Sequence, residues 1–339
     1  MIFTKLPIQK TKLIKDFQKN NFSTLIFAGQ GTQKIGMTKQ YEQQNPEKYE
    51  KICSEINEKL QYNIKELMQN GPLKQLNQTE FTQPAIFTNQ LLSYELNKEY
   101  LQKNYDIKTT IGNSVGEYAA LYCAGILPDY LQIVKILQKR GQLMQKACQN
   151  QECGMLAITS GENEFQVMKF SNKVRKDFPE QKMGLALFNS NQQVVFSGNK
   201  QILQEFNRVL KEEKIPSIFL KLQTAFHSEI LSPVKEEFQE FLQQNLTIND
   251  PSQISIKTIK NYDGEIYDSK ESVIEGLVQQ FDRPVLFYQS IAKNLIQQKE
   301  RQFIEIGETN VVGKFVDQIG EQFGIQDDLE IISFKPQQQ

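Results

Sequence analysis

Ser114 stands between two glycines in the segment Ile-Gly-Asn-Ser-Val-Gly-Glu, residues 111–117. Residues 109–111 are of β type, and a helical stretch, 117–124, follows the serine. This order is typical of a nucleophile elbow, a strained strand-to-helix turn that exposes a serine hydroxyl at a helix N-terminus. The N–H of Val115 would then point to the place where an oxyanion forms. A surface turn that carries the same residues by chance is the alternative.

A serine nucleophile needs a general base, usually an imidazole, and this sequence contains a single histidine. That residue is His227, in the segment Ala-Phe-His-Ser at 225–228. A histidine without a chemical role, packed or exposed, is the alternative. The same count excludes a metal cluster built on histidines, and Cys148 with Cys153 would offer only two thiolate ligands.

Arg140 falls within the apolar face of a predicted helix, residues 131–144. An arginine costs several kcal/mol to bury without a partner, so we expect it to meet a carboxylate. An internal Asp or Glu and the carboxylate of a ligand are both compatible with this pattern. The apolar residues of the face are Ile133, Val134, Ile136, Leu137, Leu143 and Met144.

A glycine-rich loop, Phe-Ala-Gly-Gln-Gly-Thr-Gln at residues 27–33, follows the first strand-like run. No Gly-Lys-Ser/Thr follows it, and a third correctly placed glycine is missing. The loop therefore disfavours a nucleotide site.

Strand-like runs alternate with amphipathic stretches along the chain, which predicts an α/β fold with a mainly parallel sheet. Between residues 154 and 222 the order becomes strand, helix, two strands, helix and strand, the ferredoxin-like βαββαβ pattern. We expect residues 154–222 to be inserted into a large domain formed by 24–153 and 223–334. The expected strands of the large domain are 24–28, 109–111, 303–306 and 331–334, and those of the insertion are 155–159, 185–189, 194–197 and 217–221.

The overall charge of the chain does not indicate which class of partner it binds. The 339 residues include 39 basic and 40 acidic side chains, a net charge of −1, so nothing global favours nucleic acid or an anionic membrane. No apolar run approaches the roughly 20 residues that a spanning helix needs. Four scattered cysteines do not form a disulfide framework and favour a reducing compartment.

The first 23 residues are polar and carry five lysines against one acid, Asp16. Basic, acid-poor leaders of this kind resemble mitochondrial transit segments, although this one has no arginine. The leader indicates the mitochondrial matrix. The alternative is a cytoplasmic protein with a short disordered or surface-packed arm.

Taken in order, these segments resemble the malonyl-CoA:acyl carrier protein transacylase family, from about Thr24 to Val316. Residues 27–33 look like the family's FPGQGSQ loop, 112–117 like GHSxGE, and 225–228 like AFHS. The remaining similar segments are 82–85 (TQPA), 189–198 (the small-domain signature) and 303–307 (ending in EIG).

The resemblance implies an α/β-hydrolase-like large domain with an inserted ferredoxin-like domain and an active site in the cleft between them. Ser114 would be acylated, and His227, oriented by a backbone carbonyl rather than an Asp, would be its general base. The remaining implied residues are Gln30 and Val115 for the oxyanion hole, Arg140 for the malonyl carboxylate, Phe226 for malonyl selectivity, and Gln83 and Asn113 as further substrate contacts.

The implied reaction moves a malonyl group from malonyl-CoA to the phosphopantetheine thiol of holo-acyl carrier protein, for fatty acid synthesis. No metal or bound cofactor would be required. A local Lys/Arg patch would receive the acidic carrier protein. The protein would be a monomer unless it is part of a larger assembly.

Two departures from the family pattern bear on activity. Asn113 replaces the histidine before the nucleophile, and Glu308-Thr309 replaces the usual Pro-Gly. Asparagine cannot carry charge, so a catalytically weakened relative, acting as a carrier-binding or structural subunit, is one alternative. A serine hydrolase is another, but it leaves Arg140 unexplained.

A fusion of residues 1–23 to a fluorescent reporter should enter mitochondria, because its lysines are not balanced by acids. Fluorescence microscopy with a mitochondrial marker and N-terminal sequencing of the mature protein test this. A diffuse cytosolic reporter, together with a mature protein that still begins at Met1, would refute the leader.

Overall fold

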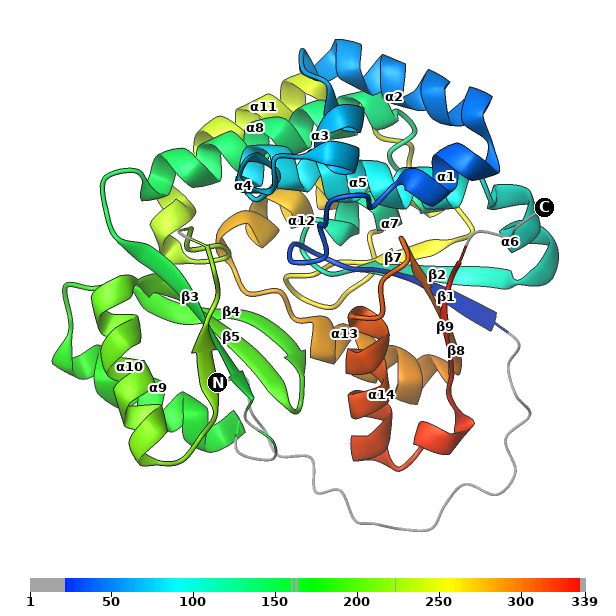
Figure 1. Ribbon diagram of the computed structural model, residues 1–339. Coiled ribbons are helices and arrows are strands. Elements are labelled where there is room, and N and C mark those ends of the chain that lie inside the picture. Colours follow the sequence, from blue (N-terminus) through cyan, green and yellow to red (C-terminus); the bar gives the residue numbers. More distant parts are fainter. Residues whose placement is uncertain (1–21, 160, 162–163, 223, 336–339) are drawn as a thin grey trace.

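The computed structural model describes residues 22–335 apart from 160, 162–163 and 223. Its larger part is built around a five-stranded sheet (Figure 1) with the order β7-β2-β1-β8-β9. Every neighbouring pair in this sheet is parallel, which confirms the α/β class expected from the sequence. The strands are β1 (Phe22–Phe27), β2 (Asp106–Gly112), β7 (Lys257–Ile259), β8 (Gln302–Ile306) and β9 (Glu330–Ser333).

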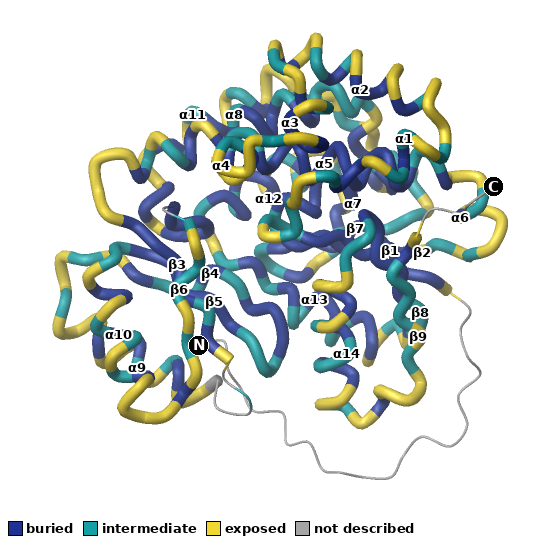
Figure 2. The backbone as a smooth tube through the Cα atoms, viewed as in Figure 1, coloured by how far each residue is buried: buried dark blue, intermediate teal, exposed yellow. Residues whose placement is uncertain are grey.

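Helices cover both faces of this sheet. Most of β1 and the C-terminal part of β2 are therefore buried and dark in Figure 2, whereas β9 is intermediate or exposed. Successive side chains of a strand point to opposite faces. In β1, Leu25 and Phe27 join the larger core, formed with α2, α5, α7, α8, α11 and α12, whereas Ile26 joins a second core formed with α13 and α14. The helices of this part are α1 (Lys39–Gln44), α2 (Pro46–Leu60), α3 (Ile64–Asn70), α4 (Leu73–Leu76), α5 (Thr79–Glu95), α6 (Lys98–Asn104), α7 (Gly116–Ala124), α8 (Tyr130–Cys148), α11 (Lys235–Asn245), α12 (Lys270–Asp282), α13 (Phe287–Lys293) and α14 (Val312–Phe323).

A second, four-stranded sheet has the order β4-β5-β3-β6, with every neighbouring pair antiparallel. Its element order along the chain confirms the predicted βαββαβ pattern. The elements are β3 (Cys153–Thr159), α9 (Glu164–Asp177), β4 (Met183–Ser190), β5 (Gln193–Asn199), α10 (Lys200–Glu212) and β6 (Ser217–Phe219). The domain boundaries at 154 and 222 stay a prediction.

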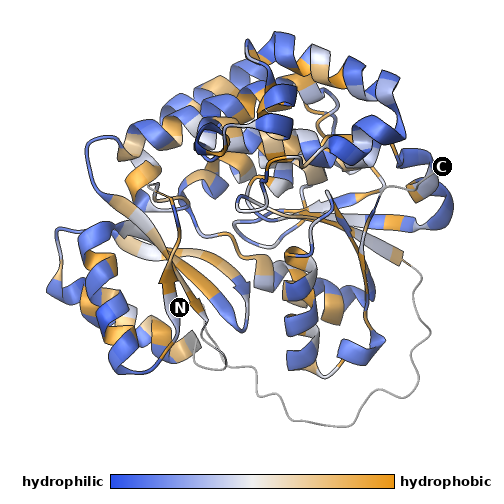
Figure 3. Cartoon of the chain, in the orientation of Figure 1, coloured by the Kyte–Doolittle hydropathy of each residue, from blue (hydrophilic) through white to orange (hydrophobic). Residues whose placement is uncertain are grey.

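The small sheet has its own core because α10 is strongly amphipathic. Ile202, Leu203, Phe206 and Leu210 recur at helical spacing and pack with strand residues such as Phe196. Figure 3 shows apolar residues along these strands and hydrophilic residues on much of the outward surface of the helices.

Three features differ from the sequence-based expectations or lie outside them. Strand β7 has only three residues and is not among the strands predicted from the sequence. The expected leader lies almost wholly outside the described residues, and its boundary after residue 23 falls inside β1, which begins at Phe22. Within the described residues, no helix combines the length and apolar character that crossing a bilayer requires.

Candidate active site

The elbow begins where β2 ends at Gly112 and closes where α7 begins at Gly116. Between them Ser114 has φ +53°, a left-handed conformation that residues with a Cβ rarely adopt. Both glycines are required by close contacts. A Cβ on Gly112 would lie 2.0 Å from the Glu117 nitrogen, and one on Gly116 would lie 2.4 Å from the Phe27 carbonyl oxygen.

His227 lies directly beside the serine. Its Nε2 is 2.6 Å from Ser114 Oγ, and its Nδ1 is 2.6 Å from the backbone carbonyl oxygen of Gln280. A carbonyl oxygen only accepts hydrogen bonds, so Nδ1 carries the proton and Nε2 keeps a lone pair for the serine hydroxyl. The structure thus brings together the two residues expected to form the dyad, in the tautomer that a general base needs.

The imidazole is neutral near pH 7. His227 is buried, and this burial lowers its pKa to about 3, with the positive charge of Arg140 acting in the same direction. The hydrogen bond to the Gln280 carbonyl partly opposes the shift. A proton acceptor is therefore in place, but the nearby cation weakens it.

Arg140 is 2% exposed and meets neither an internal carboxylate nor open solvent. Its Nη1 donates to Gln83 Oε1 at 2.6 Å and its Nη2 to Gln280 Oε1 at 2.7 Å, while the guanidinium lies over the Tyr118 ring. Within the described part of the chain it forms no ion pair, and its Nε has no acceptor. Of the two alternatives for its carboxylate partner, the internal Asp or Glu is not found, because neutral amide oxygens take that place. They satisfy two donors and leave the charge without a counter-ion.

Gln280 connects these groups and was missed in the sequence. Besides accepting from Arg140, its side chain donates to the Ser114 carbonyl oxygen at 2.8 Å and to Glu117 Oε2. One glutamine therefore contacts the elbow, the cation and, through its backbone, the imidazole. A usable signal existed, since Gln280 interrupts the apolar face of α12 that contains Val273 and Leu277.

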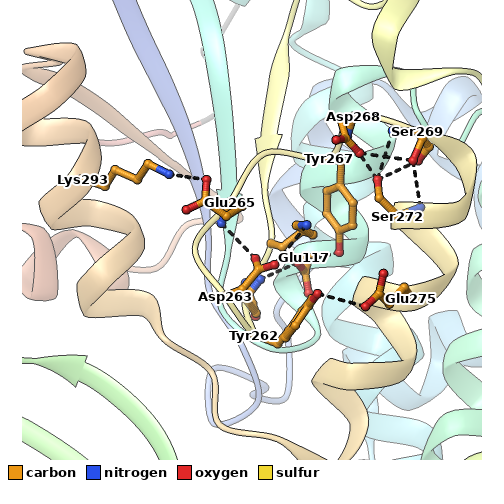
Figure 4. Close-up of polar contacts among 12 residues, drawn as sticks. Glu117, Tyr262, Asp263, Glu265, Tyr267, Asp268, Ser269, Ser272, Glu275 and Lys293 are labelled. Carbon is orange, nitrogen blue, oxygen red and sulfur yellow. Dashed lines mark hydrogen bonds and ion pairs between the residues drawn. The ribbon is translucent and has the colours of Figure 1, made fainter. Parts of the chain in front are cut away.

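Asn261, which follows β7, holds the elbow from the other side. Its Oδ1 accepts from the Ser114 N–H at 2.8 Å, and its Nδ2 donates to the Gly112 carbonyl oxygen at 2.7 Å. Glu117 Oε1 in turn accepts from the Asn261 N–H. It also accepts from the Tyr267 hydroxyl, and Figure 4 shows these two side chains next to each other. Complete burial raises the pKa of Glu117 to about 8, although these hydrogen bonds and Arg140 oppose the shift.

The loop after β1 lies against the elbow. A Cβ on Gly29 would lie 2.7 Å from the Asn113 carbonyl oxygen, so Gln30 and Val115 belong to neighbouring segments. Gln30 Oε1 accepts from Thr79 Oγ1, which in turn accepts from Gln83 Nε2. The contribution of the Gln30 and Val115 N–H groups to an oxyanion hole stays a prediction.

Both departures from the family motifs have hydrogen-bonding roles. Asn113 Nδ2 donates to Asn189 Oδ1 at 3.0 Å, which ties the elbow to β4 of the small sheet. The Thr309 hydroxyl donates to the buried Glu305 carboxylate, which also accepts from the Gly313 N–H in the first turn of α14. These contacts leave the dyad geometry intact.

A cleft of about 1100 Å³ lies beside the dyad, which is not itself part of its wall. Two of the expected site residues, Gln30 and Phe226, line this cleft, and Phe226 is 7% exposed. Because Phe226 directly precedes His227 in the chain, the cleft lies close to the general base. Its wall also holds Lys74, Lys146, Lys200 and Lys221, together with Cys148 and Cys153. The described residues contain no group of three or more His, Cys, Asp or Glu side chains that could hold a metal ion.

The geometry agrees with a comparison of sequences. A model of the acyl transferase domain matches residues 24–332. The chain belongs to the acyl transferase family. A polyketide biosynthesis malonyl CoA-acyl carrier protein transacylase of Bacillus velezensis is 31% identical over 300 residues, which cover 87% of this acyltransferase and 96% of the relative. A malonyl CoA-acyl carrier protein transacylase of Bacillus subtilis is 30% identical, covering 87% and 89%.

Solved structures agree with this assignment. The malonyl CoA-acyl carrier protein transacylase of Clostridium perfringens is 31% identical with a TM-score of 0.79, covering 91% of this chain and 92% of that one. A malonyl-transacylase in complex with its type II polyketide acyl carrier protein gives a TM-score of 0.82 at 25% identity, covering 91% and 94%. The acyltransferase is thus an enzyme of the acyl-carrier-protein S-malonyltransferase family.

Replacing His227 with Gln should change how the free energy of unfolding depends on pH. The folded-state pKa of about 3 lies below the ordinary 6.5, so below pH 6.5 the unfolded chain binds a proton that the folded protein does not. The stability from neutral His227 is therefore fully present above pH 6.5 and is lost as the pH falls toward 3, at roughly 1.4 kcal/mol per pH unit.

Urea denaturation of wild type and H227Q between about pH 7 and pH 5 measures this effect as a difference between the two proteins. Glu117 and the surface carboxylates are present in both, and the sequence has no other histidine, so the difference isolates His227. A difference that stays constant across this range would contradict the buried, neutral imidazole.

Proposed function

We propose that the protein transfers a malonyl group from malonyl-CoA to the phosphopantetheine thiol of acyl carrier protein, through a malonyl-Ser114 intermediate, in fatty acid synthesis. This proposal rests mainly on the dyad, in which Ser114 Oγ lies 2.6 Å from His227 Nε2. Next to it is the buried Arg140, which lacks a counter-ion. The two Bacillus relatives, both malonyl CoA-acyl carrier protein transacylases, support malonyl transfer, and one of them is an enzyme of polyketide biosynthesis.

In the proposed first half-reaction, Ser114 Oγ attacks the thioester carbonyl while His227 Nε2 takes the hydroxyl proton. The oxyanion that forms would be stabilised by the N–H groups of Val115 and Gln30. The coenzyme A thiolate then leaves and takes the proton from His227. The carrier thiol reverses these steps in the second half-reaction, which gives ping-pong kinetics.

Arg140 supplies the reason for a malonyl rather than an acetyl group. The free malonyl carboxylate would provide the counter-ion that the two glutamines do not, and a planar guanidinium binds a carboxylate through two parallel hydrogen bonds. Binding this anion would also offset the charge that lowers the pKa of His227. The general base would therefore become stronger when the correct substrate is bound.

The proposed carrier-binding surface is the lysine-bearing wall of the cleft. Lys146 and Lys200 already pair with Glu237 and Glu152 on exposed surface, where ion pairs are weak and exchangeable. Acidic carrier proteins would be attracted to such a wall. The relative solved in complex with its acyl carrier protein supports this choice of partner.

Two other functions have less support. A weakened, carrier-binding relative rests on Asn113, but Asn113 bonds Asn189 and does not disturb the Ser114–His227 contact. A serine hydrolase would share the dyad, but it gives no role to a buried guanidinium without a counter-ion.

Replacing Ser114 with Ala should abolish the malonyl adduct, because the nucleophile is lost. Replacing His227 with Ala should slow adduct formation by at least about 100-fold, since general base catalysis is lost. Intact-protein mass spectrometry after rapid mixing with malonyl-CoA measures both rates, and holo-carrier protein added afterwards tests transfer. Normal adduct formation in either variant would exclude this dyad, and an adduct that water clears as fast as the carrier does would favour the hydrolase.

Replacing Arg140 with Ala should reduce the ratio of malonyl to acetyl transfer by roughly 30-fold or more. A desolvated contact to a carboxylate contributes about 2 to 5 kcal/mol. Since each factor of ten corresponds to about 1.4 kcal/mol, the lower value already gives roughly 30-fold. The acetyl group has no carboxylate, so its transfer does not lose this contact. Arg140→Lys should recover only part of the ratio, because an ammonium group restores the positive charge but not the two parallel hydrogen bonds of a guanidinium.

Lys139→Ala is the matched control, since Lys139 lies on the same helix but pairs with Glu237. Its ratio should equal that of wild type. Rates with both thioesters and a melting curve for each variant separate a specificity defect from a folding defect. A well-folded R140A protein with the wild-type ratio would show that Arg140 does not recognise the carboxylate.

A further inference from the structure

Cys148 and Cys153 flank the connection between the two sheets. Cys148 ends α8, the helix that carries Arg140, and Cys153 begins β3 of the small sheet. The two side chains form one small buried cluster with Ala225 and Ile230. Both cysteines also line the cleft beside the dyad, so they border the space that a bound molecule would enter.

The surroundings of Cys148 favour its thiolate. The Ala225 N–H donates to Cys148 Sγ at 3.4 Å, and Cys153 packs in the same small buried cluster as this sulfur. Interaction with the Cys153 thiol lowers the pKa of Cys148, against the effect of burial. The same interaction, together with burial, raises the pKa of Cys153. One sulfur is therefore prepared as a nucleophile and its neighbour as the proton-bearing partner.

The other two cysteines do not share these features. Cys53 and Cys123 lie in the larger core, and burial raises the pKa of both, that of Cys53 to about 12. Neither lines the cleft. They serve as internal controls of the same residue type.

We propose that Cys148 and Cys153 are a redox modification site, which coenzyme A disulfide oxidises to a reversible Cys148–Cys153 disulfide that inhibits the enzyme. The choice of this oxidant rests on the proposed function, in which the cleft receives a phosphopantetheine arm. The disulfide of the same arm would bring its sulfur into the cleft, where both cysteines lie.

The reaction is an ordinary thiol–disulfide exchange. The Cys148 thiolate attacks one sulfur of coenzyme A disulfide, forms a mixed disulfide and releases one coenzyme A thiolate. Cys153 then loses its proton and attacks the Cys148 sulfur, which releases the second coenzyme A thiolate. Two protein thiols are oxidised by two electrons, and one disulfide is reduced to two thiols after protonation.

Inhibition follows from the position of the pair. The mixed disulfide would occupy the cleft that malonyl-CoA needs. The internal disulfide would change the acceptor of the Ala225 N–H, two residues before His227, and would fix the four-residue connection to the small sheet. A misplacement on the order of 1 Å in a dyad costs up to about 100-fold in rate, so a loss of at least about tenfold is expected.

The test uses the full-length protein, treated with excess coenzyme A disulfide or, separately, glutathione disulfide. Alkylation of the remaining thiols followed by peptide mapping should show Cys148 joined to Cys153, with Cys53 and Cys123 alkylated as before. The rate of Ser114 malonylation should fall at least about tenfold and return after treatment with dithiothreitol. Coenzyme A disulfide should react faster than glutathione disulfide.

Variants identify the steps. C153A should retain a coenzyme A adduct on Cys148, because the resolving thiol is missing, whereas C148A should form neither product. The C53A/C123A double variant should behave as wild type. Melting curves check that each variant folds. Peptide mapping of the treated wild-type protein tests for the disulfide even if a variant does not fold.

Three results would overturn the proposal. Cys148 and Cys153 that remain free thiols after treatment would exclude the site, and a complete internal disulfide with unchanged malonylation would exclude its inhibitory effect. Equal rates with the two disulfides would exclude recognition of the phosphopantetheine arm. Peptide mapping does not depend on malonyl transfer, so a protein that never malonylates Ser114 disproves the proposed function separately.

Discussion

The buried charge of Arg140 is the constraint on which the site depends. A guanidinium that is 2% exposed has to satisfy its donors inside the protein, and the chain supplies two glutamine oxygens. Each glutamine continues the network in a different direction. Gln83 leads through Thr79 to the loop of Gln30, and Gln280 leads to the nucleophile and the base. The polar groups that line the reaction centre are thus the same groups that make the burial of this cation tolerable.

The acid of this network, Glu117, lies near Arg140 without forming an ion pair with it. Its carboxyl group accepts from Gln280, Tyr267 and Asn261, so its hydrogen-bonding capacity serves the elbow rather than the cation. A direct ion pair would neutralise the guanidinium and remove its attraction for a substrate carboxylate. Neutral amides between Glu117 and Arg140 keep the cation available. Burial raises the pKa of Glu117, and burial together with the charge of Arg140 lowers that of His227.

The sequence predicted those parts of the site that rest on local geometry. The elbow at Ser114, the sheet class and the βαββαβ order follow from residue types that neighbour one another in the chain, because tight turns and strand alternation leave local patterns. Gln280 and Asn261 could not be found in this way, since they lie 166 and 147 residues from the serine that they hold. Strand β7 has only three residues, too few for a periodic signal. The neutral partners of Arg140 were missed for a related reason, because an apolar helix face shows that a charge is buried without showing what it meets.

The segment after α12 explains how two separate sheets can form one precise site. The Val285 N–H donates to the Ala186 carbonyl oxygen of β4, and the Val285 carbonyl oxygen accepts from Phe188, so the small sheet hydrogen-bonds to this segment. The next residue, Leu286, donates to the carbonyl oxygen of Asn261, the residue that holds the elbow. Five residues before Val285, the carbonyl of Gln280 orients His227. A shift of the small sheet would therefore act on the same short segment that positions both nucleophile and base. This coupling gives a physical reason why the dyad keeps its hydrogen-bond geometry beside a cleft whose wall includes residues of both the larger part and the small sheet.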